Sequence, residues 1–402
     1  MTLQTFKLIV YLLFGKCLNT TYDISMKKIL HIANDYSGSR VYKELISSID
    51  ELGVAQTVFT TIRKEGERGK NSISFQTKGS RIYYSDNWKP IHRLSFRLKR
   101  KSNFSHLLDC IDPHTITHVH AHTLFSDGAL ALQLKKEYDI PYTVSIRNTD
   151  LNTYMRFMFH TWNIGREVID NADKIIVISP AHAKRVSRWI ALPKGFSDKV
   201  VNIPNGVNQF WLENIQAKTH AHNSDAPWEI LYIGNFTPNK NVPRLMNSII
   251  NLNTSNQLSV KLHIVGSQGR DTNRINGIAN KHPDLFHLYG RIEDKQEILK
   301  IMRKCHIFAM PSHHETFGLV YVEAMSQGLP VLYTEGEGID GFFDENYGVS
   351  CNSNSTQSII DGLNQLILNY HNYEINPDFI KNHFSWDRIA EYYLNNIYTI
   401  GK

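Results

Sequence analysis

The stretch that decides the fold is Phe308-Ala-Met-Pro311-Ser-His-His-Glu315-Thr-Phe-Gly318-Leu-Val-Tyr-Val-Glu323-Ala-Met-Ser-Gln-Gly328-Leu-Pro330-Val331. An apolar run ends at Met310, a polar loop carries Glu315, a helical stretch begins near Gly318, and a second apolar run follows. This order predicts a βαβ unit. A glycine in the loop lets the backbone approach a ligand, and the free N–H groups of a helix start favour an anion such as phosphate.

The same alternation of short apolar runs and amphipathic stretches continues along the chain. It predicts strands at Lys28–Ala33, Gln56–Thr61, His118–Ala121, Tyr142–Ile146, Lys174–Ile178, Val200–Ile203, Glu229–Ile233, Lys261–Val265, His287–Tyr289, Ile307–Met310 and Val331–Tyr333. Helices are expected at Ser39–Leu52, Ser126–Glu137, Ala181–Ile190, Val242–Asn253, Lys295–Lys304 and Gly318–Gln327. Alternating strands and helices predict an α/β protein with two doubly wound, Rossmann-like domains that face each other across a cleft.

Composition and patterning divide the chain into five expected segments. Residues 1–25 form a loose N-terminal extension, 26–204 the first domain, 205–228 a linker with few apolar residues, and 229–380 the second domain. The last segment, 381–402, is expected to form a helix that packs back on the first domain. The apolar run Leu8–Phe14 is too short to span a bilayer.

The overall composition is that of an ordinary folded protein. Hydrophobic residues make up 42% of the chain and charged residues 20%, which excludes a disordered, collagen-like or coiled-coil protein. The four cysteines include no C-x-x-C pair, so a disulfide scaffold, a zinc knuckle and a redox motif are disfavoured, and a reducing, cytoplasmic location is expected. No G-x-G-x-x-G follows a predicted strand, which argues against a dinucleotide oxidoreductase.

Charge is divided unevenly between the two halves. Residues up to Pro204 contain 29 Lys and Arg against 18 Asp and Glu, and the remainder 15 against 20. The basic half is expected to face an anionic partner. Its densest segment, Arg93–Lys101, interleaves cations with leucines and a phenylalanine; it fits both an interfacial helix on anionic lipid and a solvated helix face. Nucleic-acid binding would leave the Glu315–Glu323 region unexplained, so none is expected.

The Glu315-x7-Glu323 spacing, with Pro311-Ser before it and Gly328-x-Pro330-Val after it, resembles the signature of the retaining nucleotide-sugar glycosyltransferases of family 4, which have the GT-B fold. Further matches follow the family's order along the chain. They are Ile203-Pro-Asn-Gly-Val207, Leu231-Tyr-Ile-Gly234, Pro238-x-Lys240-Asn, Ile264-Val-Gly266 and Phe384-Ser-Trp386. The resemblance covers Met26 to the C-terminus.

The resemblance implies a set of functional residues. The catalytic candidates are Lys240, Glu315 and Arg147, and the donor-binding candidates are Gly38, Asn235, Lys240, Glu315, Thr316, Phe317, Gly318 and Glu323. Ser37 and Ser39 are also expected to cap the helix that follows Gly38. The family usually has arginine where this chain has Asn235, so a substitute cation is expected from Arg291 or Arg40. The chain has no D-x-D triplet, and neither a metal nor a cofactor is expected.

The acceptor-side candidates are His120, His122 and Asp150. The two histidines alternate along a strand end and could hold a metal, but no third ligand with plausible spacing is evident. A plain structural role is the alternative. Arg147 stands where relatives often carry a sugar-contacting histidine; it fits neutralisation of an acceptor carboxylate or phosphate, and Asp150 fits a pair with it or a contact with sugar hydroxyls.

These residues lead to a functional prediction with two rivals. The resemblance implies transfer of a sugar from a nucleoside-diphosphate sugar to a glycan or polyprenyl-linked acceptor in cell-surface polysaccharide synthesis. The expected place is the cytoplasm, with peripheral contact at the inner face of the cell membrane. The rivals are a nucleotide-sugar 2-epimerase of the same architecture and a non-catalytic GT-B partner protein.

Overall fold

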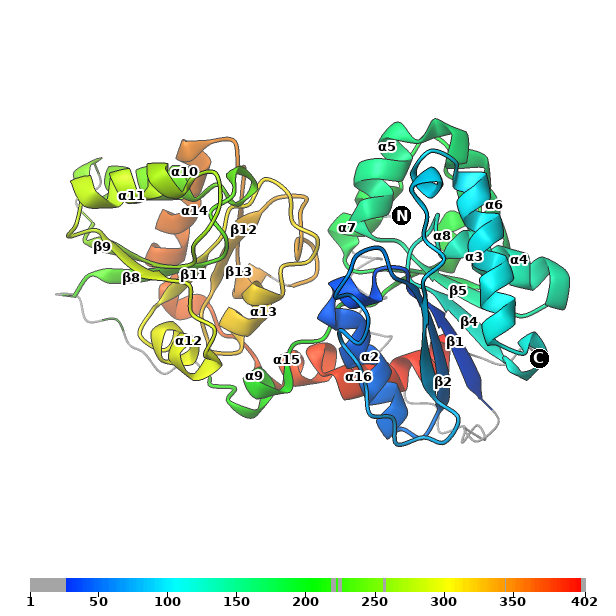
Figure 1. Cartoon of the computed structure of the whole chain (residues 1–402). Coiled ribbons are helices and arrows are strands. Elements are labelled where there is room, and N and C mark those ends of the chain that lie inside the picture. The colour runs from blue at the N-terminus through cyan, green and yellow to red at the C-terminus, as the bar shows by residue number, and fades with distance from the viewer. Residues whose placement is uncertain (1–26, 218–221, 223–225, 256–257, 344, 399–402) are drawn as a thin grey trace. The chain divides into compact units, whose positions relative to one another are not determined.

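The structure, a computed structural model, describes residues 27–217, 222, 226–255, 258–343 and 345–398 (Figure 1). The chain forms two compact units. Of the described residues, the first unit contains those up to Val177, Val186–Ile203 and those from Ile389 onward, and the second contains those of Ile178–Arg185 and Pro204–Arg388. The expected N-terminal extension, residues 1–25, lies outside the described residues.

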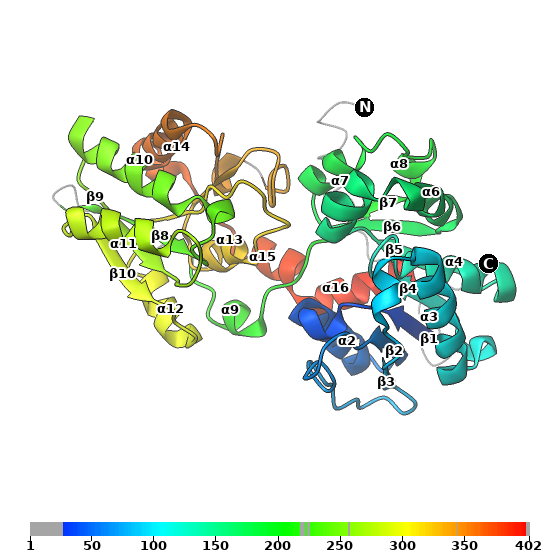
Figure 2. The same ribbon diagram turned by 45° about the horizontal axis from the view of Figure 1, so that its top comes forward.

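The first unit is built on a seven-stranded parallel sheet with the order β3-β2-β1-β4-β5-β6-β7 (Figure 2). Its central strands are buried on both faces, which explains their nearly continuous apolar runs. The strands are β1 (Lys28–Ile32), β2 (Ala55–Thr61), β3 (Arg81–Ser85), β4 (His118–Ala121), β5 (Tyr142–Ser145), β6 (Lys174–Val177) and β7 (Val200–Asn202).

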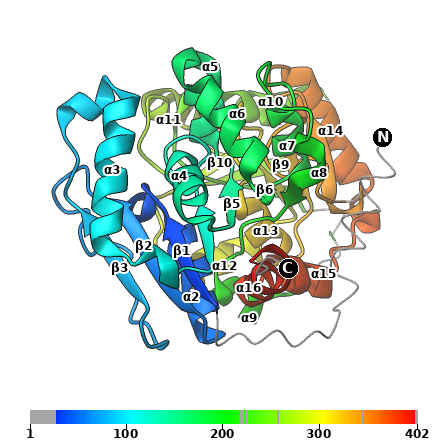
Figure 3. The ribbon, with the colours of Figure 1, turned by 90° about the vertical axis from the view of Figure 1, so that its right-hand side faces the viewer.

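Helices cover both faces of this sheet. They are α2 (Arg40–Glu51), α3 (Phe96–Cys110), α4 (Gly128–Tyr138), α5 (Met155–Phe157), α6 (Trp162–Asn171) and α8 (Phe196–Lys199). Helices α3, α4 and α6 lie on one face and α2 on the other (Figures 1 and 3). The segment after Ile389 also belongs to this unit: the Lys27 ammonium donates to the Leu394 carbonyl at 2.6 Å, and Tyr398 is buried.

The second unit has a six-stranded parallel sheet with the order β10-β9-β8-β11-β12-β13. Its strands are β8 (Trp228–Ile233), β9 (Val260–Val265), β10 (Phe286–Gly290), β11 (Ile307–Ala309), β12 (Val331–Thr334) and β13 (Gly348–Cys351). Its helices are α9 (Gln209–Glu213), α10 (Val242–Ser255), α11 (Thr272–Lys281), α12 (Lys295–Met302), α13 (Leu319–Met325), α14 (Thr356–Leu368) and α15 (Pro377–Phe384). Helices α7 (Pro180–Val186) and α16 (Trp386–Tyr392) each contain a boundary between the units.

The two doubly wound sheets confirm the predicted fold class. Every predicted strand is present and ends within one residue of its expected bounds. Two strands, β3 and β13, were not predicted. Both lie at sheet edges and are short, and β3 has mostly half-exposed side chains, so neither has the apolar run of a central strand. Helix α7 ends at Val186, four residues before the expected end. No helix in the described part of the chain is both long and apolar enough to cross a membrane.

Candidate active site

The loop between β11 and α13 carries the first candidate residues of the second unit. Gly318 directly precedes α13 in a left-handed conformation, with φ of 80°. A Cβ on this glycine would lie 2.5 Å from the Tyr321 ring, so the turn requires glycine. Phe317 is buried in contact with the rings of Phe342 and Phe384. Its side chain therefore belongs to the core, and only its backbone is free for a ligand contact.

Replacement of Gly318 by alanine is expected to lower the melting temperature, because the left-handed φ and the contact with Tyr321 together cost about 1–3 kcal/mol. Gly277→Ala in α11 is the matched control: its Cβ would meet nothing within 4 Å, and alanine favours a helix interior. Thermal unfolding of both variants makes the comparison. Equal melting temperatures for Gly318→Ala and the wild type would contradict the strain argument.

A second loop, between β8 and α10, holds Lys240 against the Glu315 loop. Asn239 connects the two loops through a pair of amide contacts: its Nδ2 donates to the His314 carbonyl at 2.8 Å, and its Oδ1 accepts from the His314 N–H at 3.0 Å. Asn241 donates to the carbonyls of Pro311 and Ser353. These bonds fix the two loops relative to each other without a ligand.

Lys240 and Glu315 meet directly at this junction. The ammonium Nζ lies 2.6 Å from Glu315 Oε2, and both side chains are largely buried. A partly buried cation on a fixed loop is suited to stabilise a diphosphate, because little reorganisation is needed when negative charge develops. The sequence predicted both residues as catalytic candidates, and the structure brings them together.

Glu337 is a neighbour of this pair that the sequence did not indicate. Its carboxylate accepts from the Glu315 N–H at 3.0 Å and pairs with Arg185 at 3.1 Å. In return, the Gly338 N–H donates to the Glu315 carbonyl at 3.1 Å. The loop after β12 therefore bonds to both the N–H and the carbonyl of Glu315.

Glu323 lies within α13 and is half-buried. Burial raises the pKa of Glu323 to about 7, although a hydrogen bond from Trp211 and the nearby charge of Lys295 act in the opposite direction. The group therefore changes charge near neutral pH. A carboxylate in such a place accepts hydrogen bonds from hydroxyl groups strongly, because each bond is charge-assisted.

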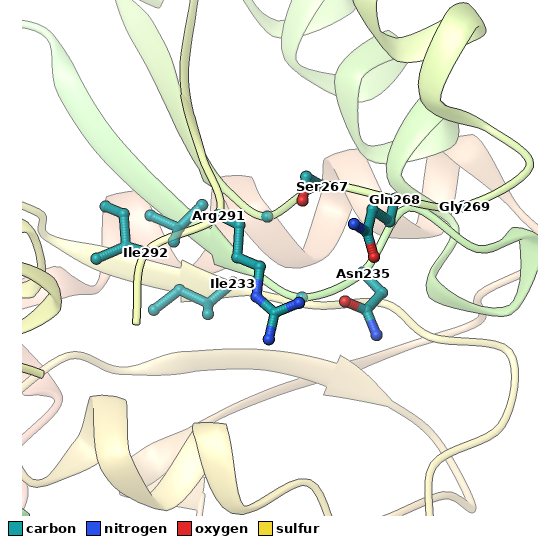
Figure 4. A pocket seen from close by; sticks show the side chains of 10 residues that line it. Ile233, Asn235, Ser267, Gln268, Gly269, Arg291 and Ile292 are labelled. Atoms are coloured by element: carbon teal, nitrogen blue, oxygen red, sulfur yellow. The ribbon is translucent and has the colours of Figure 1, made fainter. Parts of the chain in front are cut away.

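An open pocket of about 510 Å³ lies where β8, β9 and β10 end (Figure 4). Asn235 and Arg291 both line it, together with Ile233, Gly234, Val265, Gly266, Ser267, Gln268, Gly269 and Ile292. At Gly266 a Cβ would lie 1.9 Å from the Gly234 carbonyl oxygen, so glycine permits the close approach of two strand ends. The carboxyl ends of parallel strands are the usual ligand-binding edge of such sheets. Of the two candidates for the substitute cation, Arg291 lines the same pocket as Asn235, whereas Arg40 belongs to the first unit.

The candidates of the first unit lie at the corresponding edge of its own sheet. Gly38 ends a 3-10 turn, Tyr36–Gly38, between β1 and α2. Of the two expected serine caps, Ser39 occupies the N-cap position of α2 but makes no side-chain cap bond, and Ser37 is no cap, because its hydroxyl donates to the Glu67 carbonyl at 2.9 Å. The Arg147 guanidinium lies 5.8 Å from the ring centre of Tyr42.

Asp150 is buried and engaged with backbone. Its two oxygens accept the N–H groups of Leu124 at 3.1 Å, Phe125 at 3.3 Å and Arg147 at 2.9 Å. Burial raises the pKa of Asp150 to about 6 against these hydrogen bonds. The carboxylate thus ties the loops after β4 and β5 together. His120 and His122 are fully buried as well, so none of the three acceptor-side candidates has a side chain exposed to an incoming sugar.

Comparison with known proteins identifies the class that this fold and site define. Residues 38–209 match Glycosyltransferase Family 4, and residues 214–386 match Glycosyl transferases group 1. The chain therefore belongs to the family 4, or group 1, glycosyltransferases and is an enzyme of that family.

Relatives and solved structures are consistent with this assignment. An uncharacterized glycosyltransferase of Methanocaldococcus jannaschii is 26% identical over 287 residues, covering 68% of this chain and 73% of the relative. The lipopolysaccharide outer core galactosyltransferase WaaB has a TM-score of 0.69 at 16% identity, covering 92% of this chain and 99% of WaaB. Anabaena HepE, solved with UDP-glucose, has a TM-score of 0.61 at 14% identity, covering 90% and 97%. The structural likenesses show the GT-B fold.

Proposed function

We propose that this glycosyltransferase is retaining and metal-independent, and that it moves a hexose from a nucleoside-diphosphate sugar to a glycan or lipid-linked acceptor in cell-surface polysaccharide synthesis. The observation that carries the proposal is the Lys240–Glu315 pair, fixed by hydrogen bonds between two loops of the second sheet. Lys240 and the backbone at Thr316–Gly318 take the diphosphate charge. Glu315 contacts the sugar, and Glu323 accepts the ribose hydroxyls.

The proposed reaction needs no protein nucleophile. The bond between the anomeric carbon and the phosphate oxygen breaks, the acceptor hydroxyl attacks from the same face, and the leaving phosphate takes the hydroxyl proton. Arg147, in the basic first unit, neutralises an acceptor carboxylate or phosphate. A sugar trapped covalently on a side chain would contradict this route.

A thermal-shift panel of nucleotides and nucleotide sugars without added metal tests the donor assignment. A ligand at 100 times its dissociation constant adds about 2.7 kcal/mol of stability, which gives a measurable shift. We expect the uridine series to shift the melting temperature, since HepE was solved with UDP-glucose. No shift with any nucleotide would favour the non-catalytic alternative. Conversion of donor to its epimer without an acceptor would favour the epimerase.

Peripheral membrane contact is proposed at the start of α3. Leu94, Leu98 and Ile91 are 84%, 48% and 45% exposed, and Arg97 and Lys101 lie exposed beside them. Apolar side chains among exposed cations are typical of a surface that binds anionic lipid. An open groove of about 530 Å³, lined in part by Ile91 and Leu98, lies at the same place.

Co-sedimentation with vesicles tests this surface. The wild type should bind anionic vesicles at low salt, and the double change Leu94→Glu with Leu98→Glu should reduce the bound fraction about tenfold or more. Ile190→Glu is the control, because Ile190 is 85% exposed elsewhere in the first unit and should not alter binding. Equal binding by the double variant and the wild type would contradict the proposed surface.

A further inference from the structure

The first unit contains a cluster of three buried histidines that the transfer chemistry leaves unused. His31 on β1 and His120 on β4 are register partners on neighbouring strands, and His122 follows β4 directly. All three are 0% exposed. Each ring offers one nitrogen such that the three nitrogens lie within 4.8 Å of one another.

The spacing of the nitrogens suits a metal ion. His31 Nδ1 lies 3.1 Å from His122 Nε2. Two nitrogens bound at 2.0–2.1 Å to a tetrahedral ion are about 3.3 Å apart, so this pair needs to move only a few tenths of an ångström. His120 contributes the third nitrogen, and its ring centre is 4.0 Å from that of His122.

Hydrogen bonds around the cluster orient His31 for ligation. Gln56 Nε2 donates to the Ile46 carbonyl at 3.0 Å, which turns Gln56 Oε1 toward His31 Nε2 at 3.1 Å. An amide oxygen can only accept, so His31 Nε2 carries the proton and His31 Nδ1 accepts a hydrogen bond from His122 Nε2. A metal ion would take the place of this hydrogen bond, and the displaced proton would move to His122 Nδ1, which has no hydrogen-bond partner among the described residues. A carbonyl oxygen on the far nitrogen of a ligating histidine is the usual outer partner in metal sites.

The protonation state of the cluster is also that of metal ligands. Burial lowers the pKa of His31 to about 4, and burial with neighbouring positive groups holds the pKa of His120 and His122 well below the usual value. These shifts favour the neutral imidazole, which is the form that binds a metal.

From this geometry we infer that His31, His120 and His122 form a site for one divalent transition-metal ion of the zinc type. The Tyr398 hydroxyl is hydrogen-bonded to His120 Nδ1 at 2.6 Å, and it would complete a four-coordinate shell if this distance opened to about 3.3 Å. The Arg147 guanidinium acts electrostatically on the same histidines, so a buried ion there has a charge cost. Coordination of Tyr398 as a phenolate, with loss of its proton to solvent, would reduce that cost.

Such an ion would be structural. The cluster is closed to solvent, so the ion would bind during folding and join β1, β4 and Tyr398, which lies four residues before the end of the chain. It would play no part in the transfer reaction proposed above, which needs no metal. The inference does not depend on the proposed function, and its test does not require the donor or the acceptor.

Metal content of the full-length, untagged protein tests the inference. The chain is produced in zinc-supplemented medium, dialysed against a weak chelator and analysed by elemental mass spectrometry. We expect about one equivalent of zinc per chain. Refolding with Co²⁺ in place of zinc should give the visible absorption of a tetrahedral cobalt site. A wild type that holds less than about a tenth of an equivalent after both treatments would overturn the inference.

Two matched variants distinguish the loss of a metal ligand from the general effect of replacing a buried histidine. His122 and His118 are both buried, and each has one hydrogen-bonded ring nitrogen and one buried ring nitrogen without a partner among the described residues. They differ in position, because His118 lies outside the three-histidine cluster and its Nε2 bonds to Thr143. His122→Gln should lose the metal, and His118→Gln should keep it. Equal metal content in the two variants would contradict the site. The site is supported if His118→Gln retains the metal and His122→Gln does not.

Discussion

Replacement of Lys240 by alanine is expected to lower turnover by about 10²–10³-fold, the loss typical of removing one preorganised group that stabilises developing charge. We expect this because the Lys240 ammonium is held in place before the reaction. It lies 2.6 Å from the Glu315 carboxylate, on a loop that Asn239 and Asn241 fix by hydrogen bonds. Steady-state kinetics with the donor identified by the thermal-shift panel measures the effect. A fall of less than threefold would assign the stabilising role to another residue.

Two controls separate charge stabilisation from damage to the fold. Lys261→Ala removes an exposed lysine from β9 in the same unit and should leave turnover unchanged. In Lys240→Ala the Glu315 carboxylate loses its partner, so part of the loss could come from a displaced Glu315. Adding Glu315→Gln to Lys240→Ala removes that unpaired charge. Because Glu315 itself is proposed to contact the sugar, the informative result is a double variant faster than Lys240→Ala, which would assign part of the loss to the unpaired carboxylate.

The apolar runs were sufficient to predict the central strands. Strands such as β1 and β4 have neighbours on both sides and are buried on both faces, so each residue must be compatible with the interior. The edge strands β3 and β13 have one neighbour each, as β7 and β10 do, but their sequences, Arg-Ile-Tyr-Tyr-Ser and Gly-Val-Ser-Cys, lack an uninterrupted apolar run. Hydrophobic periodicity cannot identify such strands.

Candidate site residues could be named from the sequence where they are part of a contiguous motif. Lys240 and Glu315 belong to short segments with a recognisable spacing, and the strand-end loops place them together. Glu337 belongs to no such pattern. Its contact with the Glu315 N–H depends on the path of a loop containing Gly336, Gly338 and Gly341, all of which have positive φ. Only the folded loop reveals the contact.

The histidine cluster illustrates the same limit. His120 and His122 were considered as a metal pair, and a third ligand was sought at a short sequence spacing. The third histidine, His31, is distant in sequence but faces His120 because β1 pairs with β4. The predicted strands contained both residues, whereas the strand order that makes them neighbours was not deduced from hydrophobicity.

Glu323→Ala is expected to weaken binding of the nucleotide sugar about 10–100-fold, because one carboxylate that accepts two ribose hydroxyls contributes charge-assisted hydrogen bonds. Isothermal titration with the intact nucleotide sugar measures the change. Unchanged affinity for the donor would contradict the ribose assignment. Glu297→Gln, on the exposed face of α12, should leave donor affinity unaltered.

The pH dependence of donor binding gives a second test of Glu323. Its pKa in the folded protein, about 7, exceeds the ordinary value of 4.5, so the protonated form is favoured below about pH 7. Burial of this carboxyl therefore reduces folding stability as the pH rises from about 4.5 through 7. Donor binding has the opposite dependence, because ribose hydroxyls donate to the carboxylate: affinity should increase from about pH 6 to 8. The diphosphate of an intact nucleotide sugar does not titrate in this range, so the Glu323→Gln variant should bind with nearly constant affinity across it. A wild type whose affinity is equally constant would show that the ribose is held by another group.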